Sequence, residues 1–80
     1  MASSRQQRGA VRLPGRSLSP RQVEIIQLMA YGYNYDEIGK KLWLSTETIK
    51  SHVKLAKLRL GIRGNAALLI AVAFREGWVK

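Results

Sequence analysis

Cap residues and glycines divide residues 18–80 into four short segments. Each segment starts with a Ser or Asn, whose side-chain oxygen accepts hydrogen bonds from the free N–H groups of a first helical turn. The cap residues are Ser19, Asn34, Ser45 and Asn65, and the glycines suited to end helices are Gly32, Gly61 and Gly77. No proline occurs from residue 21 to residue 80, and the period-two alternation typical of strands is absent. The sequence therefore predicts an all-α fold.

Four helices are predicted, over about residues 20–31, 35–42, 46–60 and 66–76. The first has the clearest start, because Ser19, Pro20 and Gln22 form a capping box with proline at the first helical position. Residues 18–80 have the length of one small domain, whose core is modest.

Positive charge is in large excess, with 14 Lys and Arg against 5 Asp and Glu and a formal net charge of +9. This excess favours a polyanionic partner, nucleic acid first and an anionic membrane surface second. Residues 1–17 carry Arg5, Arg8, Arg12 and Arg16 and no acidic residue, so we expect a disordered basic arm there. The arm is either a solvated tail or leader, or a segment that grips phosphate or enters a minor groove.

Several functional classes lack the residues that they need. There is no cysteine, so disulfides and thiolate metal sites are excluded. His52 is the only histidine, and we interpret it as a packed residue or, failing that, a phosphate contact. No catalytic constellation, phosphate-binding glycine loop or metal cluster is recognisable, so we expect neither an enzyme nor a cofactor. Without a membrane-spanning run or a signal peptide, the chain is expected to be cytoplasmic.

The second and third predicted helices are near enough in sequence to form a helix-turn-helix. Helices in this motif cross at close range, which needs a small residue on the first helix, and Gly39 supplies it. Ile38, Ile49 and Val53 are the apolar residues expected at the crossing. Gly39 is also compatible with an ordinary αα-hairpin, in which it is only a weak point of the helix.

The third predicted helix has an apolar side and a basic side. One stripe recurs at helical spacing and is predicted to be buried, namely Ile49, Val53, Ala56 and Leu60. The other stripe holds Thr46, Lys50, Lys54 and Lys57, with Ser51 beside them. No Glu stands four residues before any of these lysines, so we expect them to be unpaired and to face phosphates and base edges in a major groove.

Residues 18–62 resemble the LuxR/GerE-type helix-turn-helix domain of bacterial response regulators and quorum-sensing regulators. The matching stretches are LSPRQ at 18–22, EIG at 37–39, LWLS at 42–45, TIKSH at 48–52 and RLG at 59–61. A weaker likeness continues to the end of the fourth helix. The resemblance implies that residues 18–80 are such a domain, which binds double-stranded DNA for a bacterial or phage transcription regulator and places helix 46–60 in the major groove.

The resemblance assigns base or groove contacts to Lys50, Ser51 and Lys54. The resemblance also implies a phosphate contact for Thr48. Further phosphate contacts are expected from Arg21, Thr46, Lys57 and Arg59. Leu55 and Leu58 depart from the family, because polar residues are usual at their positions. The resemblance does not extend to a receiver or ligand-binding domain. The starting methionine and short arm favour a free-standing regulator over a piece of a larger one.

Residues 66–74, AALLIAVAF, are apolar without interruption. A helix that is apolar on all sides is buried on several sides, and so small a chain has too little mass to cover it. We therefore expect a homodimer through the fourth helix, with Leu68, Leu69 and Val72 in the interface. The alternative is a core helix with surplus exposed alanine.

Three functions compete at this point. The first is sequence-specific transcription regulation. The second is a protein-interaction module that docks on RNA polymerase or another regulator and has incidental DNA affinity. The third is binding to a membrane surface through the arm and the fourth helix. The caps and the helix crossing argue against the third, because they specify a compact fold, so we expect no membrane partner.

Overall fold

The structure is a computed structural model that describes residues 17–80. Its four helices are α1 (Pro20–Ala30), α2 (Tyr35–Leu42), α3 (Thr46–Arg59) and α4 (Ala66–Arg75). No strand occurs among the described residues, and the predicted all-α fold is confirmed. Each helix begins where it was predicted, while α1, α3 and α4 end one residue earlier. The arm predicted for residues 1–17 lies, except for Ser17, outside the described residues.

Local hydrogen bonds explain where the helices begin. Ser19 Oγ accepts from the Gln22 N–H at 3.1 Å, and Gln22 Oε1 accepts from the Ser19 N–H at 2.9 Å, which completes the predicted capping box. Asn34 and Glu37 form a second box, with both hydrogen bonds at 2.8 Å. The starts of α3 and α4 carry single caps, Ser45 and Asn65.

Three helices end with the same hydrogen-bond pattern. At the ends of α1, α3 and α4, the second N–H beyond the cap bonds to a carbonyl five residues back, as in a Schellman motif. These bonds join Tyr33 to Leu28 at 3.2 Å, Ile62 to Lys57 at 2.8 Å and Trp78 to Ala73 at 2.8 Å. The residue between the cap and the N–H donor has positive φ at each of these ends. It is a glycine that was predicted to end the helix, namely Gly32, Gly61 or Gly77.

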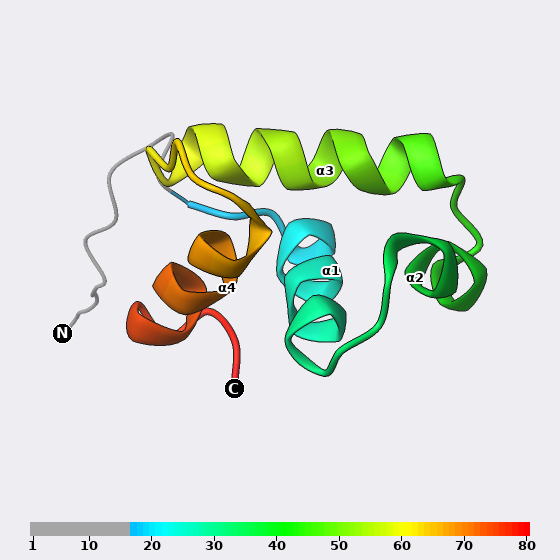
Figure 1. Ribbon diagram of the computed structural model, residues 1–80, viewed down its shortest axis with the longest axis horizontal. Coiled ribbons are helices and arrows are strands. Elements are labelled where there is room, and N and C mark those ends of the chain that lie inside the picture. The colour runs from blue at the N-terminus through cyan, green and yellow to red at the C-terminus, as the bar shows by residue number, and fades with distance from the viewer. Residues whose placement is uncertain (1–16) are drawn as a thin grey trace, which may run out of the picture.

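Packing buries one side of α3 and leaves its other side open. α1 contacts each of the other three helices, and α3 also contacts all three of its neighbours. Figure 1 shows α3 along one long edge of the molecule, with α1, α2 and α4 on the same side of it. The largest fully buried side chains come from all four helices, and they are Ile25, Ile26, Ile38, Ile49 and Leu69.

α4 buries one face within the chain itself. Leu69 is fully buried and Val72 is 9% exposed, because both pack in the core that α4 shares with α1 and α3. Both side chains are therefore used in the core of this chain, and their predicted place in a dimer interface stays a prediction. Leu68 is 46% exposed and remains accessible. Although α4 is apolar, none of the described helices is long and apolar enough to cross a membrane.

The C-terminal residues close the core beside α1. Val79 is buried. The side chain of Gln27 donates to the Lys80 carbonyl oxygen at 2.8 Å and accepts from the Lys80 N–H at 2.9 Å. These two hydrogen bonds hold Lys80 against α1.

Candidate nucleic-acid interface

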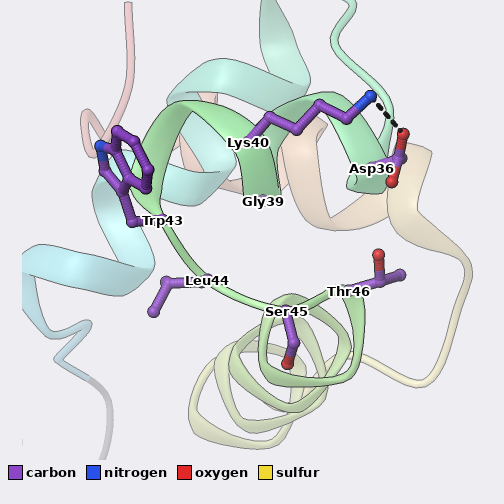
Figure 2. A pocket seen from close by; sticks show the side chains of 7 residues that line it. All are labelled: Asp36, Gly39, Lys40, Trp43, Leu44, Ser45 and Thr46. Atoms are coloured by element: carbon purple, nitrogen blue, oxygen red, sulfur yellow. Dashed lines mark ion pairs between the residues drawn. The ribbon is translucent and has the colours of Figure 1, made fainter.

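A three-residue turn, residues 43–45, joins α2 to α3. Trp43 ends α2 in the left-handed region, with φ of 60°, and the Leu44 N–H donates to the Gly39 carbonyl oxygen at 2.9 Å. A Cβ atom on Gly39 would lie 2.5 Å from the Leu44 carbonyl oxygen. Gly39 therefore allows the turn backbone to lie directly against α2. Figure 2 shows the turn passing from Trp43 through Leu44 to Ser45, below Gly39.

The close approach at Gly39 differs in kind from the predicted one. The expected neighbour was the crossing helix, whereas the atoms nearest to a Cβ at this position belong to the backbone of residues 44–45. Ile38, Ile49 and Val53, which were expected at the crossing, are all buried in the core cluster. The tight turn and the shared core together hold α3 at a fixed orientation to α2.

The first turn of α3 is held by its cap. Ser45 Oγ accepts from the Thr48 N–H at 3.1 Å and lies 2.9 Å from Thr48 Oγ1, with which it shares a hydrogen bond. Thr46 and Thr48 are both half-buried. The two threonines predicted to contact phosphate are thus at the N-terminal end of α3, and the second is already part of the cap.

The outer side of α3 presents Lys50, Ser51 and Lys54, all of which are exposed. Lys50 Nζ lies 3.7 Å from Glu47 Oε2, so the prediction that the lysines are unpaired is wrong for Lys50. The acidic partner, Glu47, stands three residues earlier, a spacing that also places two side chains side by side on a helix. Both side chains of this pair are exposed, so it contributes less than about 1 kcal/mol and leaves Lys50 available to a ligand. Lys54 has no hydrogen-bond or ion-pair partner within residues 17–80.

Lys57 and Arg59, near the end of α3, bond to backbone oxygens outside the helix. Lys57 Nζ donates to the Gly64 carbonyl oxygen at 3.3 Å, and Lys57 is half-buried. Arg59 Nη1 donates to the Ser17 carbonyl oxygen at 3.1 Å. These contacts fasten α3 to the segments before α1 and α4, a role that the helical pattern did not reveal.

Arg21, which like Lys57 and Arg59 was predicted to contact phosphate, lies on α1. Its Nη1 atom is 3.1 Å from Glu24 Oε1, and both side chains are substantially exposed. Arg21 therefore has a local partner on its own helix.

An open groove lies between α2 and the start of α3 (Figure 2). Lys40 Nζ is 3.4 Å from Asp36 Oδ2 across one side of it. Trp43 also lines the groove and is 93% exposed. Sequence reasoning placed Trp43 in the turn without giving it a function. Trp43 has a left-handed backbone, which is rare for a bulky residue and is not indicated by the residues around it.

Comparisons with known proteins agree with this geometry. Residues 16–72 match the family described as "Bacterial regulatory proteins, luxR family". The transcriptional regulatory protein DegU of Brevibacillus brevis is 37% identical over an alignment of 71 residues, and the alignment covers 86% of this chain and 29% of DegU. The transcriptional regulatory protein RcsB of Escherichia coli strain K12 is 43% identical over 54 residues, which are 68% of this chain and 25% of RcsB.

The chain spans less than a third of the length of these relatives. The family match includes all of α1, α2 and α3 with the turn between the last two, and it extends into α4. It therefore covers the segment whose motifs carried the resemblance in the sequence. This chain belongs to the LuxR family of bacterial regulatory proteins.

Proposed function

We propose that this chain binds specific sequences of double-stranded DNA with α3 in the major groove, and that it regulates transcription in the bacterial cytoplasm. The observation that carries the proposal is the division of α3 into two sides. Ile49 and Val53 anchor one side in the core, while Lys50, Ser51 and Lys54 stand open on the other. The printed names of DegU and RcsB as transcriptional regulatory proteins support the regulatory part.

The size of α3 suits a major groove. Its 14 residues make a rod about 21 Å long at 1.5 Å per residue. The groove of B-DNA is about 12 Å wide and admits one α-helix. Lys50 and Lys54 are one helical turn apart and can donate to guanine edges or phosphates, while the Ser51 hydroxyl can donate or accept at a base edge.

Phosphate contacts are proposed for residues around this surface. They come from the start of α3, from its end and from the first turn of α1, and they are Thr46, Thr48, Lys57, Arg59 and Arg21. Such contacts fix the register of the protein on the duplex and carry no sequence information. The last three each have an internal partner, so DNA binding would exchange or share those hydrogen bonds.

Selection of bound duplexes from a random DNA pool, near physiological salt and followed by sequencing, tests the proposal. We expect enrichment of an inverted repeat whose half-sites are about 10 base pairs apart, because two recognition helices then enter successive turns of the groove. Recovery without sequence preference, lost steeply as salt rises, would contradict it, since only counterion release would remain.

We place the interface of the proposed homodimer on the exposed face of α4. Ala67, Ala71 and Phe74 recur at positions i, i+4 and i+7 and are exposed, and Leu68 lies beside them. Leu68 is 46% exposed and Phe74 is 48% exposed. A two-fold axis would pair this face with itself and so present two α3 helices to two half-sites.

Replacing Leu68 and Phe74 together by serine is expected to convert a dimer into a monomer without unfolding it. Both side chains are about half exposed, so the core keeps its packing while the paired face loses its apolar area. Sedimentation velocity over a range of concentrations measures the change, and circular dichroism checks helix content. Tyr31→Ser is the matched control, since Tyr31 is 66% exposed outside α4. A wild-type chain that stays monomeric at every concentration contradicts the proposed dimer.

A second candidate function is docking on RNA polymerase or another regulator. Trp43 favours it, because tryptophan is enriched in the energetic centres of protein interfaces and this one is 93% exposed. A docking module keeps its partner when the groove-facing lysines are replaced, whereas a DNA reader loses its site.

A further inference from the structure

Leu55 and Leu58 are exposed on α3, at 49% and 67%. Each stands four residues after an exposed polar residue of the outer side, because Leu55 follows Ser51 and Leu58 follows Lys54. Residues four apart are neighbours on the same side of a helix. The two leucines therefore continue the surface that carries the groove-facing residues towards the C-terminal end of α3.

No other helix covers this apolar extension. α1, α2 and α4 all lie on one side of α3 (Figure 1), and Leu55 and Leu58 are both exposed. The neighbouring residues Ala56 and Leu60 are the ones that enter the core. A single exposed leucine is ordinary on a protein surface, but two that adjoin a basic, exposed surface form an apolar patch open to the same ligand.

We propose that Leu55 and Leu58 contact the C5-methyl groups of thymine in the major groove, and so make A·T base pairs part of the recognised half-site. This inference rests on the proposed DNA-binding function and adds the class of base that is read. The thymine methyl is the apolar group that base edges present in the major groove. A leucine side chain has no donor or acceptor, so this methyl is the feature of a base edge that it can distinguish.

The spacing along α3 sets where the thymines lie. From Lys50 to Leu58 the helix rises about 12 Å, and successive base pairs are about 3.4 Å apart. The outer side therefore spans three to four base pairs. Lys50 and Ser51 lie at the N-terminal end of this stretch, Lys54 and Leu55 lie near its middle, and Leu58 lies at its C-terminal end.

Thymine-to-deoxyuridine substitution in the selected duplex tests the contact, because it removes only the methyl group and leaves base pairing intact. Each thymine of a half-site is replaced singly, and the affinity of the whole 80-residue chain is measured by fluorescence anisotropy. We expect binding to weaken about three- to fivefold at each contacted thymine, which is the loss of one buried methyl group.

Leu55→Ala and Leu58→Ala identify the side chain that makes each contact. Each variant is expected to bind the thymine duplex more weakly and to lose the deoxyuridine penalty at one position. Both leucines are exposed, so helix content by circular dichroism should not change. Tyr31→Ala is the matched control, because it removes an exposed apolar side chain at the end of α1 and should keep every penalty.

The outcomes separate this inference from the proposed function. Half-sites without thymine, equal binding of all deoxyuridine duplexes, or an unchanged penalty in both leucine variants would overturn the methyl contact while DNA binding stands. Failure to select any sequence would instead overturn the proposed function. Leucine variants that bind DNA normally but lose transcription activation with purified RNA polymerase would identify a protein-docking patch and also overturn the inference.

Discussion

Replacing Lys50 and Lys54 together by alanine is expected to weaken binding to the selected duplex by about 30-fold or more, because each groove contact contributes about 1–3 kcal/mol and about 1.4 kcal/mol is tenfold in affinity. The fold should be unaffected, since both side chains are exposed and their one internal contact within residues 17–80 is the weak pair of Lys50 with Glu47. Fluorescence anisotropy measures the affinity, and thermal unfolding by circular dichroism measures the stability.

The matched control removes the same charge elsewhere. Arg75 and Lys80 are exposed at the end of α4 and at the C-terminus, away from the outer side of α3 (Figure 1). Arg75→Ala with Lys80→Ala should cause only a small, salt-dependent loss. Equal losses in the two double variants would mean that net charge, and not groove contact, drives binding. Full affinity in the Lys50 and Lys54 variant would favour the protein-docking function.

Gly39→Ala is expected to destabilise the chain by about 2–3 kcal/mol, in the range measured for overpacked interiors. At an ordinary helix position the same change stabilises by up to about 1 kcal/mol. Here the new Cβ would lie 2.5 Å from the Leu44 carbonyl oxygen, which is backbone and cannot rotate away. The Leu44 N–H also donates to the Gly39 carbonyl oxygen, so the turn cannot move away from α2 without breaking this hydrogen bond.

The unfolding temperature should fall by about 10–20 °C, because 1 kcal/mol corresponds to about 4–8 °C for a domain of this size. Lys40→Ala is the control on the neighbouring residue, since its side chain is 79% exposed and loses only a surface ion pair with Asp36. An unchanged or higher unfolding temperature for Gly39→Ala would show that α2 and the turn separate easily, and that the close approach does not hold α3 in place.

The helices and their order were predictable because their signals are local. Side-chain caps and positive-φ glycines act within about one turn of the backbone, so the residues themselves specify where each helix begins and ends. The apolar stripe of α3 was predictable for the same reason. Its residues recur at a spacing that has one solution on a helix, and Ile49, Val53, Ala56 and Leu60 are all buried.

The buried face of α4 was not predictable, because AALLIAVAF is apolar in every direction and has no polar side to orient it. The packing of α4 against α1 and α3 buries Leu69 and Val72 in the core, whereas Leu68 and Phe74 are exposed. The partners of Lys57 and Arg59 were hidden for a related reason. The carbonyl oxygens of Gly64 and Ser17 come near them only after the chain has folded.

By itself, the sequence determined four helices, a helix-turn-helix between α2 and α3, and membership of the LuxR family, since all three rest on short-range patterns of residue type. The tertiary structure alone decided which apolar residues of α4 are available to a partner and which cations are already held by backbone oxygens. It also decided that Gly39 meets the turn and not the crossing helix. These depend on which surfaces meet across the core, and contacts between distant segments leave no periodic signal in a single sequence.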